Sequence, residues 1–235
     1  MKKLINILFL TAIIFSTSCE NDIDNYDAPN GGIRGTIYDI ETNEPIPLPV
    51  QGTAGVLVNL YEQNTNATQS VDFRAKQDGT FENSQIFNCE YKVVVNGPFV
   101  DKCEGVVSVN GPTQFDLKAT PYSRINIEAS VDDNNQVSIT YIVNKTNPSY
   151  TVSEVSFLWN FAPGVDINSS NYATRVNAKS VSGTHVFDLP KDSKFTENYY
   201  KIKSNKNKIY VRVAAKAQGI VNYSKIIELT VKDIK

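Results

Sequence analysis

The run Val155-Ser-Phe-Leu-Trp-Asn-Phe161 carries an apolar side chain at every second position. Because successive side chains of a β-strand point to opposite faces, this pattern predicts a strand with one buried face. Short β-branched or aromatic runs recur from Gly32 to the C-terminus, separated by turns rich in Gly, Asn, Asp and Pro. No segment sustains a helical apolar period for long. The sequence therefore predicts an all-β protein.

Strand-like segments in the second half of the chain predict one β-sandwich. They are 124–129, 136–143, 153–161, 174–178, 183–189, 208–217 and 223–231. Their number and spacing, with polar turns such as Asp132-Asp-Asn-Asn135, resemble an immunoglobulin or fibronectin-III-like sandwich. Pro121 cannot donate to a strand ladder and suits a linker. We expect this domain to span residues 121–235.

The first half contains a comparable series of short strands. The expected strands are 33–39, 56–61, 91–95, 106–109 and 113–117, together with a hairpin at 73–81. The Asp78-Gly79 pair supplies residues that tolerate positive φ at the hairpin turn. About seven strands result, enough for a second small sandwich.

Several short motifs of this half resemble a known family. In order, they are Gly35-Thr-Ile-Tyr-Asp39, Glu44-Pro-Ile46, Val56-Leu-Val-Asn-Leu60, Asp78-Gly-Thr-Phe81 and Tyr91-Lys-Val-Val-Val95. The set is similar to the carboxypeptidase-regulatory-like, transthyretin-type β-sandwich. The resemblance implies that residues 32–120 form a spacer or binding module without catalytic machinery. The segment from Pro47 to Gly55 is longer than the family's usual turn, and the sequence assigns it no role.

The N-terminus predicts export and lipidation. Met1-Lys-Lys3 precedes an apolar run too short to span a bilayer, which is typical of a signal peptide covering residues 1–18. The next residues, Ser16-Thr-Ser-Cys19, resemble a bacterial lipobox, although Ser16 stands where the family usually carries Leu. The resemblance implies that Cys19 carries acyl chains that anchor the protein. The alternative is an ordinary signal peptide that leaves a reactive free thiol.

The segment after Cys19 indicates where the protein resides. The acidic run Glu20-Asn-Asp-Ile-Asp24 resembles the Bacteroidetes signal for export to the outer face of the outer membrane. We expect a surface-exposed outer-membrane lipoprotein, with a periplasm-facing one as the alternative. Residues 19–31 suit a flexible tether, so that the lipid is the sole membrane contact. Removal of the signal peptide, residues 1–18, leaves about 215 residues, a length that fits two domains.

Charge and motifs argue against several functions. The formal net charge of −2 becomes about −4 once Lys2 and Lys3 are removed, which predicts no nucleic-acid binding. The single histidine, His185, lies in a predicted strand and shares a face with Phe187. The sequence contains no nucleophile elbow, HExxH, Walker loop or CxxC pair. The carboxylates lie scattered in turns, including the calcium-like run at Asp132. We therefore expect a non-enzyme without cofactor or metal.

The remaining two cysteines suggest a disulfide. Cys89 and Cys103 lie symmetrically about Asn96, the first residue of a predicted Asn-Gly-Pro turn. An antiparallel hairpin centred there would bring them face to face, and an oxidising envelope would favour the bond. The alternative is two separate small buried residues.

Aromatic residues of the second half are candidates for a ligand platform. Trp159 shares the apolar face of its strand, which favours a core role. As an alternative, it could form a platform for sugar rings with loop tyrosines, because aromatic faces suit the C–H faces of pyranoses. The candidate tyrosines are Tyr150, Tyr172, Tyr199 and Tyr200. For each tyrosine, half-buried packing at a strand end is the competing interpretation.

As a whole, the chain resembles a Bacteroidetes lipoprotein family of unknown function associated with SusC/SusD-type glycan uptake systems. The resemblance implies a non-catalytic accessory that binds glycan or acts as a spacer in polysaccharide utilisation. Polysaccharides or oligosaccharides and SusC/SusD-type outer-membrane proteins would be its partners. The alternative is a structural or assembly protein, such as a transporter-complex or pilus-like subunit, that pairs through free edge strands.

Overall fold

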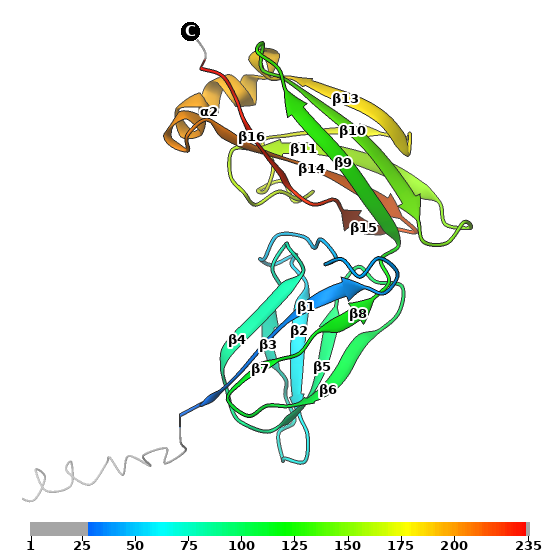
Figure 1. Cartoon of the computed structure of the whole chain (residues 1–235), viewed down its shortest axis with the longest axis vertical. Helices are drawn as coiled ribbons and strands as arrows, with labels where there is room; N and C mark the ends of the chain where they lie inside the picture. The colour runs from blue at the N-terminus through cyan, green and yellow to red at the C-terminus, as the bar shows by residue number, and fades with distance from the viewer. Residues whose placement is uncertain (1–27, 234–235) are drawn as a thin grey trace, which may run out of the picture.

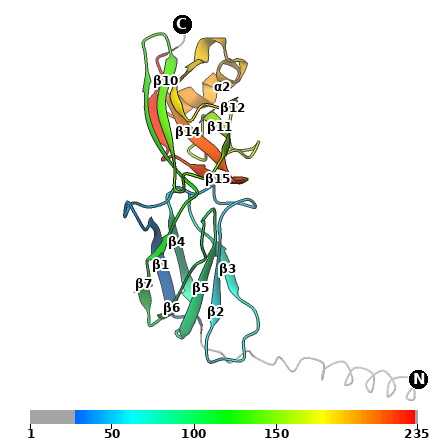
Figure 2. The same ribbon diagram turned by 90° about the vertical axis from the view of Figure 1, so that its right-hand side faces the viewer.

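The computed structural model describes residues 28–233 as two β-sandwiches stacked end to end (Figures 1 and 2). The predicted all-β fold is confirmed. The predicted signal peptide, Cys19 and the acidic run that follows it lie outside the described residues. Within the described part, no helix combines the length and apolar character needed to cross a bilayer.

The first sandwich is built from two four-stranded sheets. One has the order β4-β1-β7, with β8 also paired to β1, and the other has the order β3-β2-β5-β6. The strands are β1 Gly31–Asp39, β2 Leu57–Glu62, β3 Val71–Arg74, β4 Thr80–Ile86, β5 Glu90–Asn96, β6 Cys103–Ser108, β7 Pro112–Gln114 and β8 Leu117–Ala119. The alternating side chains of β1, β2 and β5 fill the core, with Ile37, Leu60 and Val93 fully buried.

The predicted hairpin at 73–81 is wrong, although its turn is present. Gly79 adopts a φ of +87°, as the Asp-Gly pair predicts. However, β3 pairs with β2, and β4 pairs with β1, so the two strands enter opposite sheets. Phe73 and Phe81 then approach one another from the two sheets, with ring centroids 6.3 Å apart. The turn is therefore a corner between the sheets, because both flanking strands bury side chains in one core.

The predicted disulfide is also wrong, because the hairpin turns at another residue. The β5–β6 register places Val95 opposite Cys103, whereas the carbonyl of Cys89 accepts from the N–H of Val109. The hairpin is thus centred near Phe99, which is buried and forms a bridge with Pro121. The two cysteines lie at opposite ends of the hairpin, and both thiols are free.

These thiols should therefore be intact but slow to react. Burial raises the pKa of Cys103 to about 12 and also raises the pKa of Cys89. We expect iodoacetamide to alkylate both cysteines in denaturant without reductant, and to alkylate Cys103 hardly at all in the folded protein at neutral pH. Peptide mass spectrometry measures both. A Cys89–Cys103 peptide lighter by two hydrogens would contradict the structure.

The second sandwich has a three-stranded and a five-stranded sheet. Their orders are β13-β10-β9 and β12-β11-β14-β15, with β16 also paired to β14. The strands are β9 Ser123–Val131, β10 Gln136–Lys145, β11 Val152–Asn160, β12 Thr174–Ala178, β13 Ser182–Asp188, β14 Lys208–Ala217, β15 Ile220–Tyr223 and β16 Ile227–Thr230. The segment predicted as one strand, 223–231, is thus divided between β15 and β16. The division falls at Ser224, whose hydroxyl accepts the N–H of Val213 at 3.0 Å.

One helix was missed by the sequence interpretation. A 3-10 turn, η1 (Leu189–Lys191), leads into α2 (Ser193–Ser204), which lies at the end of the second sandwich remote from the first (Figure 1). Asp192 caps α2 by accepting the N–H of Lys194, and its other oxygen accepts the Trp159 indole N–H at 2.9 Å. The buried residues Phe195 and Ile202 lie seven positions apart, which is a helical period in a short segment.

His185 makes the second sandwich sensitive to acid. Its ring stacks on Phe157 at 4.3 Å and meets the edge of Phe187 at 4.5 Å. Burial lowers the pKa of His185 below its ordinary value of about 6.5. The unfolded chain therefore binds the proton more readily, so stability declines as pH falls from about 6.5 toward the folded-state pKa.

Replacing this histidine should remove part of that acid sensitivity. We expect the melting temperature of wild type to fall more between pH 7 and pH 5 than that of His185→Phe, since phenylalanine does not titrate. Thermal unfolding followed by circular dichroism at both pH values measures the difference. An equal fall in the two proteins would show that His185 carries none of the effect.

Candidate functional site: a cleft between the two sandwiches

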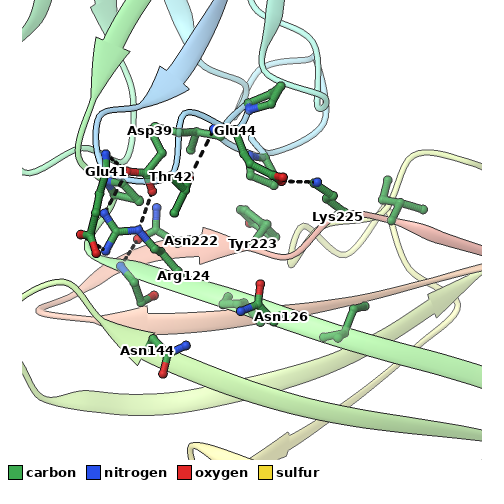
Figure 3. A pocket seen from close by; sticks show the side chains of 18 of the residues that line it. Asp39, Glu41, Thr42, Glu44, Arg124, Asn126, Asn144, Asn222, Tyr223 and Lys225 are labelled. Atoms are coloured by element: carbon green, nitrogen blue, oxygen red, sulfur yellow. Dashed lines mark hydrogen bonds and ion pairs between the residues drawn. The ribbon is translucent and has the colours of Figure 1, made fainter.

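A cleft of about 850 Å³ lies where the two sandwiches meet (Figure 3). The turn after β1 forms one wall, while β9, the end of β10 and the β15–β16 segment form the other. Its labelled polar residues are Asp39, Glu41, Thr42, Glu44, Arg124, Asn126, Asn144, Asn222 and Lys225. The volume falls within the range of small-molecule sites, and the walls come from segments far apart in the sequence.

An arginine fork joins the two walls at one side of the cleft. Arg124 donates from Nε and Nη2 to the two carboxylate oxygens of Asp39, at 2.6 and 2.8 Å, and its Nη1 lies 2.7 Å from a Glu41 oxygen. Burial acts to raise the pKa of Asp39, but the hydrogen bonds and charge of Arg124, with backbone N–H donors, outweigh it and lower this pKa. Such bidentate pairing fixes orientation as well as distance.

Two further contacts cross between the walls. Lys225 of the second sandwich pairs with Glu44 of the first (Figure 3). Asn222 accepts the backbone N–H of Ser123 at 3.1 Å and donates to the carbonyl of Pro98 at 3.0 Å. The Asn222 amide therefore uses both its oxygen and its nitrogen, and it joins Pro98 of the first sandwich to the start of β9.

Two asparagines of the cleft lack such partners. Asn126 on β9 lies opposite Ile142 of β10, so Asn144, two residues further along β10, is its diagonal neighbour on the same face. Both side chains are exposed, and neither makes a hydrogen bond within residues 28–233. In Figure 3 no dashed line reaches either amide. Each amide keeps a donor and an acceptor available to a ligand.

Aliphatic surface lies beside these amides. From the first sandwich come the half-buried side chains of Pro45 and Pro47, and from the second come those of Ile226 and Ile227. The cleft thus combines free amides, paired charges and apolar patches. A ligand with many hydroxyl groups and C–H faces would match this combination, because every hydroxyl can donate and accept.

A buried arginine holds the cleft walls in place. Arg212 of β14 is fully buried and donates to the carbonyls of Val165 and Leu48 at 2.8 Å and of Ser224 at 2.9 Å. Leu48 belongs to the first sandwich, so this guanidinium binds both halves. The cation also lies 4.5 Å from the centre of the Tyr223 ring. Burial lowers the pKa of Arg212 to about 10, which leaves the group charged at neutral pH.

The segment from Pro47 to Gly55, to which the sequence assigned no role, forms much of this interface. Besides the Leu48 carbonyl, the N–H of Val50 donates to Asp166 at 2.9 Å. The nearby Gln77 side chain donates to the carbonyl of Pro163 at 2.9 Å. Sequence patterns carried no signal for these contacts, because a polar residue within a strand does not reveal which loop it will meet.

The aromatic residues proposed from sequence lie elsewhere. Trp159 is fully buried, which leaves no face for a ligand. Tyr150 packs on Tyr122 at 5.4 Å, and Tyr172 packs against the Leu158 cluster. Tyr199 and Tyr200 lie on α2; the Tyr199 hydroxyl donates to Asp233, and Tyr200 is 68% exposed. None of the five lines the cleft, so the structure does not bring them together as a platform.

Removing the Arg212 guanidinium should loosen the junction. Arg212→Met leaves three buried carbonyls without donors, and we expect the free energy of unfolding to drop by on the order of 3 kcal/mol. Urea denaturation measures this loss, and small-angle scattering should show a broader distribution of distances between the sandwiches.

Lys216→Met provides the control, because Lys216 is an exposed lysine on the same strand. If Arg212→Met were as stable and as compact as this control, the hydrogen bonds of Arg212 would not be what holds the two sandwiches together.

Comparisons with known proteins extend the fold to relatives. Residues 31–120 match the family profile described as the N-terminal domain of a protein of unknown function, DUF3823. Two solved DUF3823 family proteins share the fold. The one from Parabacteroides merdae has 24% identity and a TM-score of 0.68 over 87% of this chain and 100% of its own. The one from Bacteroides ovatus has 20% identity and a TM-score of 0.68 over 86% of this chain and 99% of its own.

A third structure comes from Bacteroides uniformis and is provisionally assigned as a carbohydrate-binding protein. It has 18% identity and a TM-score of 0.67 over 86% of this chain and 100% of its own. No curated protein matches the chain. At these identities the likeness establishes a shared two-sandwich fold.

Proposed function

We propose that this chain is a non-catalytic surface lipoprotein that binds glycan in the cleft between its sandwiches. The observation that carries the proposal is the pair of unpartnered amides, Asn126 and Asn144, beside aliphatic surface in a firmly held cleft. A sugar presents adjacent hydroxyls that can donate to and accept from an amide, and C–H groups that pack on isoleucine and proline.

Two further observations support this proposal. The Bacteroides uniformis protein with the same fold is provisionally assigned to carbohydrate binding. The sequence features at Cys19 and the acidic run after it favour display on the cell surface. There, the protein would hold glycan for an importer of the SusC/SusD type, which we propose as its partner.

The state of the cleft carboxylates supports a binding role over glycoside hydrolysis. A carboxyl group that acts as general acid needs a raised pKa, and hydrolysis needs a second carboxylate on the other side of the sugar. Arg124 instead holds Asp39 and Glu41, and the pKa of Asp39 is lowered. Lys225 holds Glu44. These carboxylates are structural parts of the cleft walls.

Removing both free amides should weaken glycan binding. For Asn126→Ala/Asn144→Ala we expect affinity to fall roughly tenfold or more, because each lost hydrogen bond contributes about 1 kcal/mol. Isothermal titration against the glycans retained by wild type in affinity electrophoresis measures the loss. The control is Asn66→Ala, which removes an exposed asparagine outside the cleft. Equal losses in both variants, or no glycan bound by wild type, would contradict the proposed function.

An assembly role is the second candidate, and one feature favours it. β9 is an edge strand, and its residues line the same cleft, so an extended segment of a partner could pair with its free edge. Such pairing uses main-chain groups. A protein partner that bound the double asparagine variant as tightly as wild type, without competition from glycan, would favour strand addition.

A further inference from the structure

We infer that the cleft selects uncharged glycans and rejects acidic ones. This inference rests on the proposed function, and it names the class of sugar that the same cleft would take. It follows from how the charged side chains of the cleft are paired with one another.

The charges of the cleft balance and are already engaged. Three carboxylates, Asp39, Glu41 and Glu44, face three cations, Arg124, Lys145 and Lys225. Arg124 is held by two of the carboxylates and Lys225 by the third. The Lys145 ammonium donates to the carbonyl of Pro148 at 2.6 Å. Each cation thus has a partner within the protein.

An acidic sugar would enter at a cost. To reach Arg124 or Lys225, a uronate or sulfate must displace Glu41 or Glu44, and it must then stay close to the displaced carboxylate. Lys145 has no carboxylate partner, and an anion would reach it only in competition with the carbonyl of Pro148. The side chains of Glu41 and Glu44 are 71% and 60% exposed, so they present negative charge at the mouth of the cleft. The anionic group of the sugar and these carboxylates would repel one another, and the repulsion is strongest at low salt.

The free amides match the same ligand class. Asn126 and Asn144 each offer one carbonyl oxygen and one NH2 group. As diagonal neighbours across the strand pair, the two residues lie about 7 Å apart. A hydroxyl pair can satisfy both halves of an amide. A carboxylate or sulfate only accepts, so it would use the NH2 group and leave the amide oxygen facing an anion.

The test compares glycans that differ only in charge. Affinity electrophoresis of wild type would use a panel of neutral polysaccharides beside acidic counterparts, such as methyl-esterified and free polygalacturonate, or dextran and dextran sulfate. We expect the neutral member of any retained pair to bind at least about tenfold more tightly at low salt. Tighter or equal binding of the acidic member would overturn this inference alone. Retention by no glycan would overturn the proposed function with it.

A charge variant then tests the cause. Glu41→Gln/Glu44→Gln removes two carboxylates and leaves Lys225 and the Nη1 group of Arg124 without a carboxylate partner. We therefore expect affinity for the acidic member to rise about tenfold while neutral affinity changes less than about twofold. Glu104→Gln is the control, since Glu104 pairs with Lys92 outside the cleft. Unchanged discrimination in the double variant would show that these ion pairs do not set selectivity.

Discussion

The junction of the two sandwiches depends on the buried guanidinium of Arg212. A charged group without water is costly unless each of its donors finds an acceptor, and here the acceptors are carbonyls from both halves of the chain, including those of Leu48 and Val165. Separating the halves would leave the cation or these carbonyls unpartnered. A change in the angle between the sandwiches would break these hydrogen bonds of Arg212. This costs more free energy than breaking an exposed ion pair such as Lys225–Glu44.

A fixed junction has a direct consequence for binding. The cleft walls belong to different sandwiches, and a ligand that had to order them would lose affinity to the entropy of that ordering. With Arg212 and Asn222 already engaged across the junction, the wall that carries Asn126 and Asn144 is held against the wall of the first sandwich before a ligand arrives. Even a small number of hydrogen bonds to hydroxyls can then yield measurable affinity.

The sequence predicted those features that depend on local periodicity. Strands such as 155–161 follow from alternation, because one face must be buried wherever they pair. The prediction of a disulfide failed because the hairpin is centred near the buried Phe99 and not at Asn96. No local sequence pattern shows that displacement. The cleft could not be predicted for a similar reason, because its walls are joined by residues far apart in the sequence. Asp39 and Arg124 are 85 positions apart, and Glu44 and Lys225 are 181 positions apart.

The predicted aromatic platform is absent from the cleft because the core of this fold uses the largest aromatic side chains. A sandwich of about 100 residues has little interior, so its largest aromatic side chains are needed to fill it, as Trp159 does against Phe195. A ligand surface in such a protein must then be built from what the core does not use, namely short amides and aliphatic loop residues. The junction between two sandwiches is the place where loops from both can form a concave surface. Recognition in this fold therefore depends on hydrogen-bond matching more than on aromatic stacking.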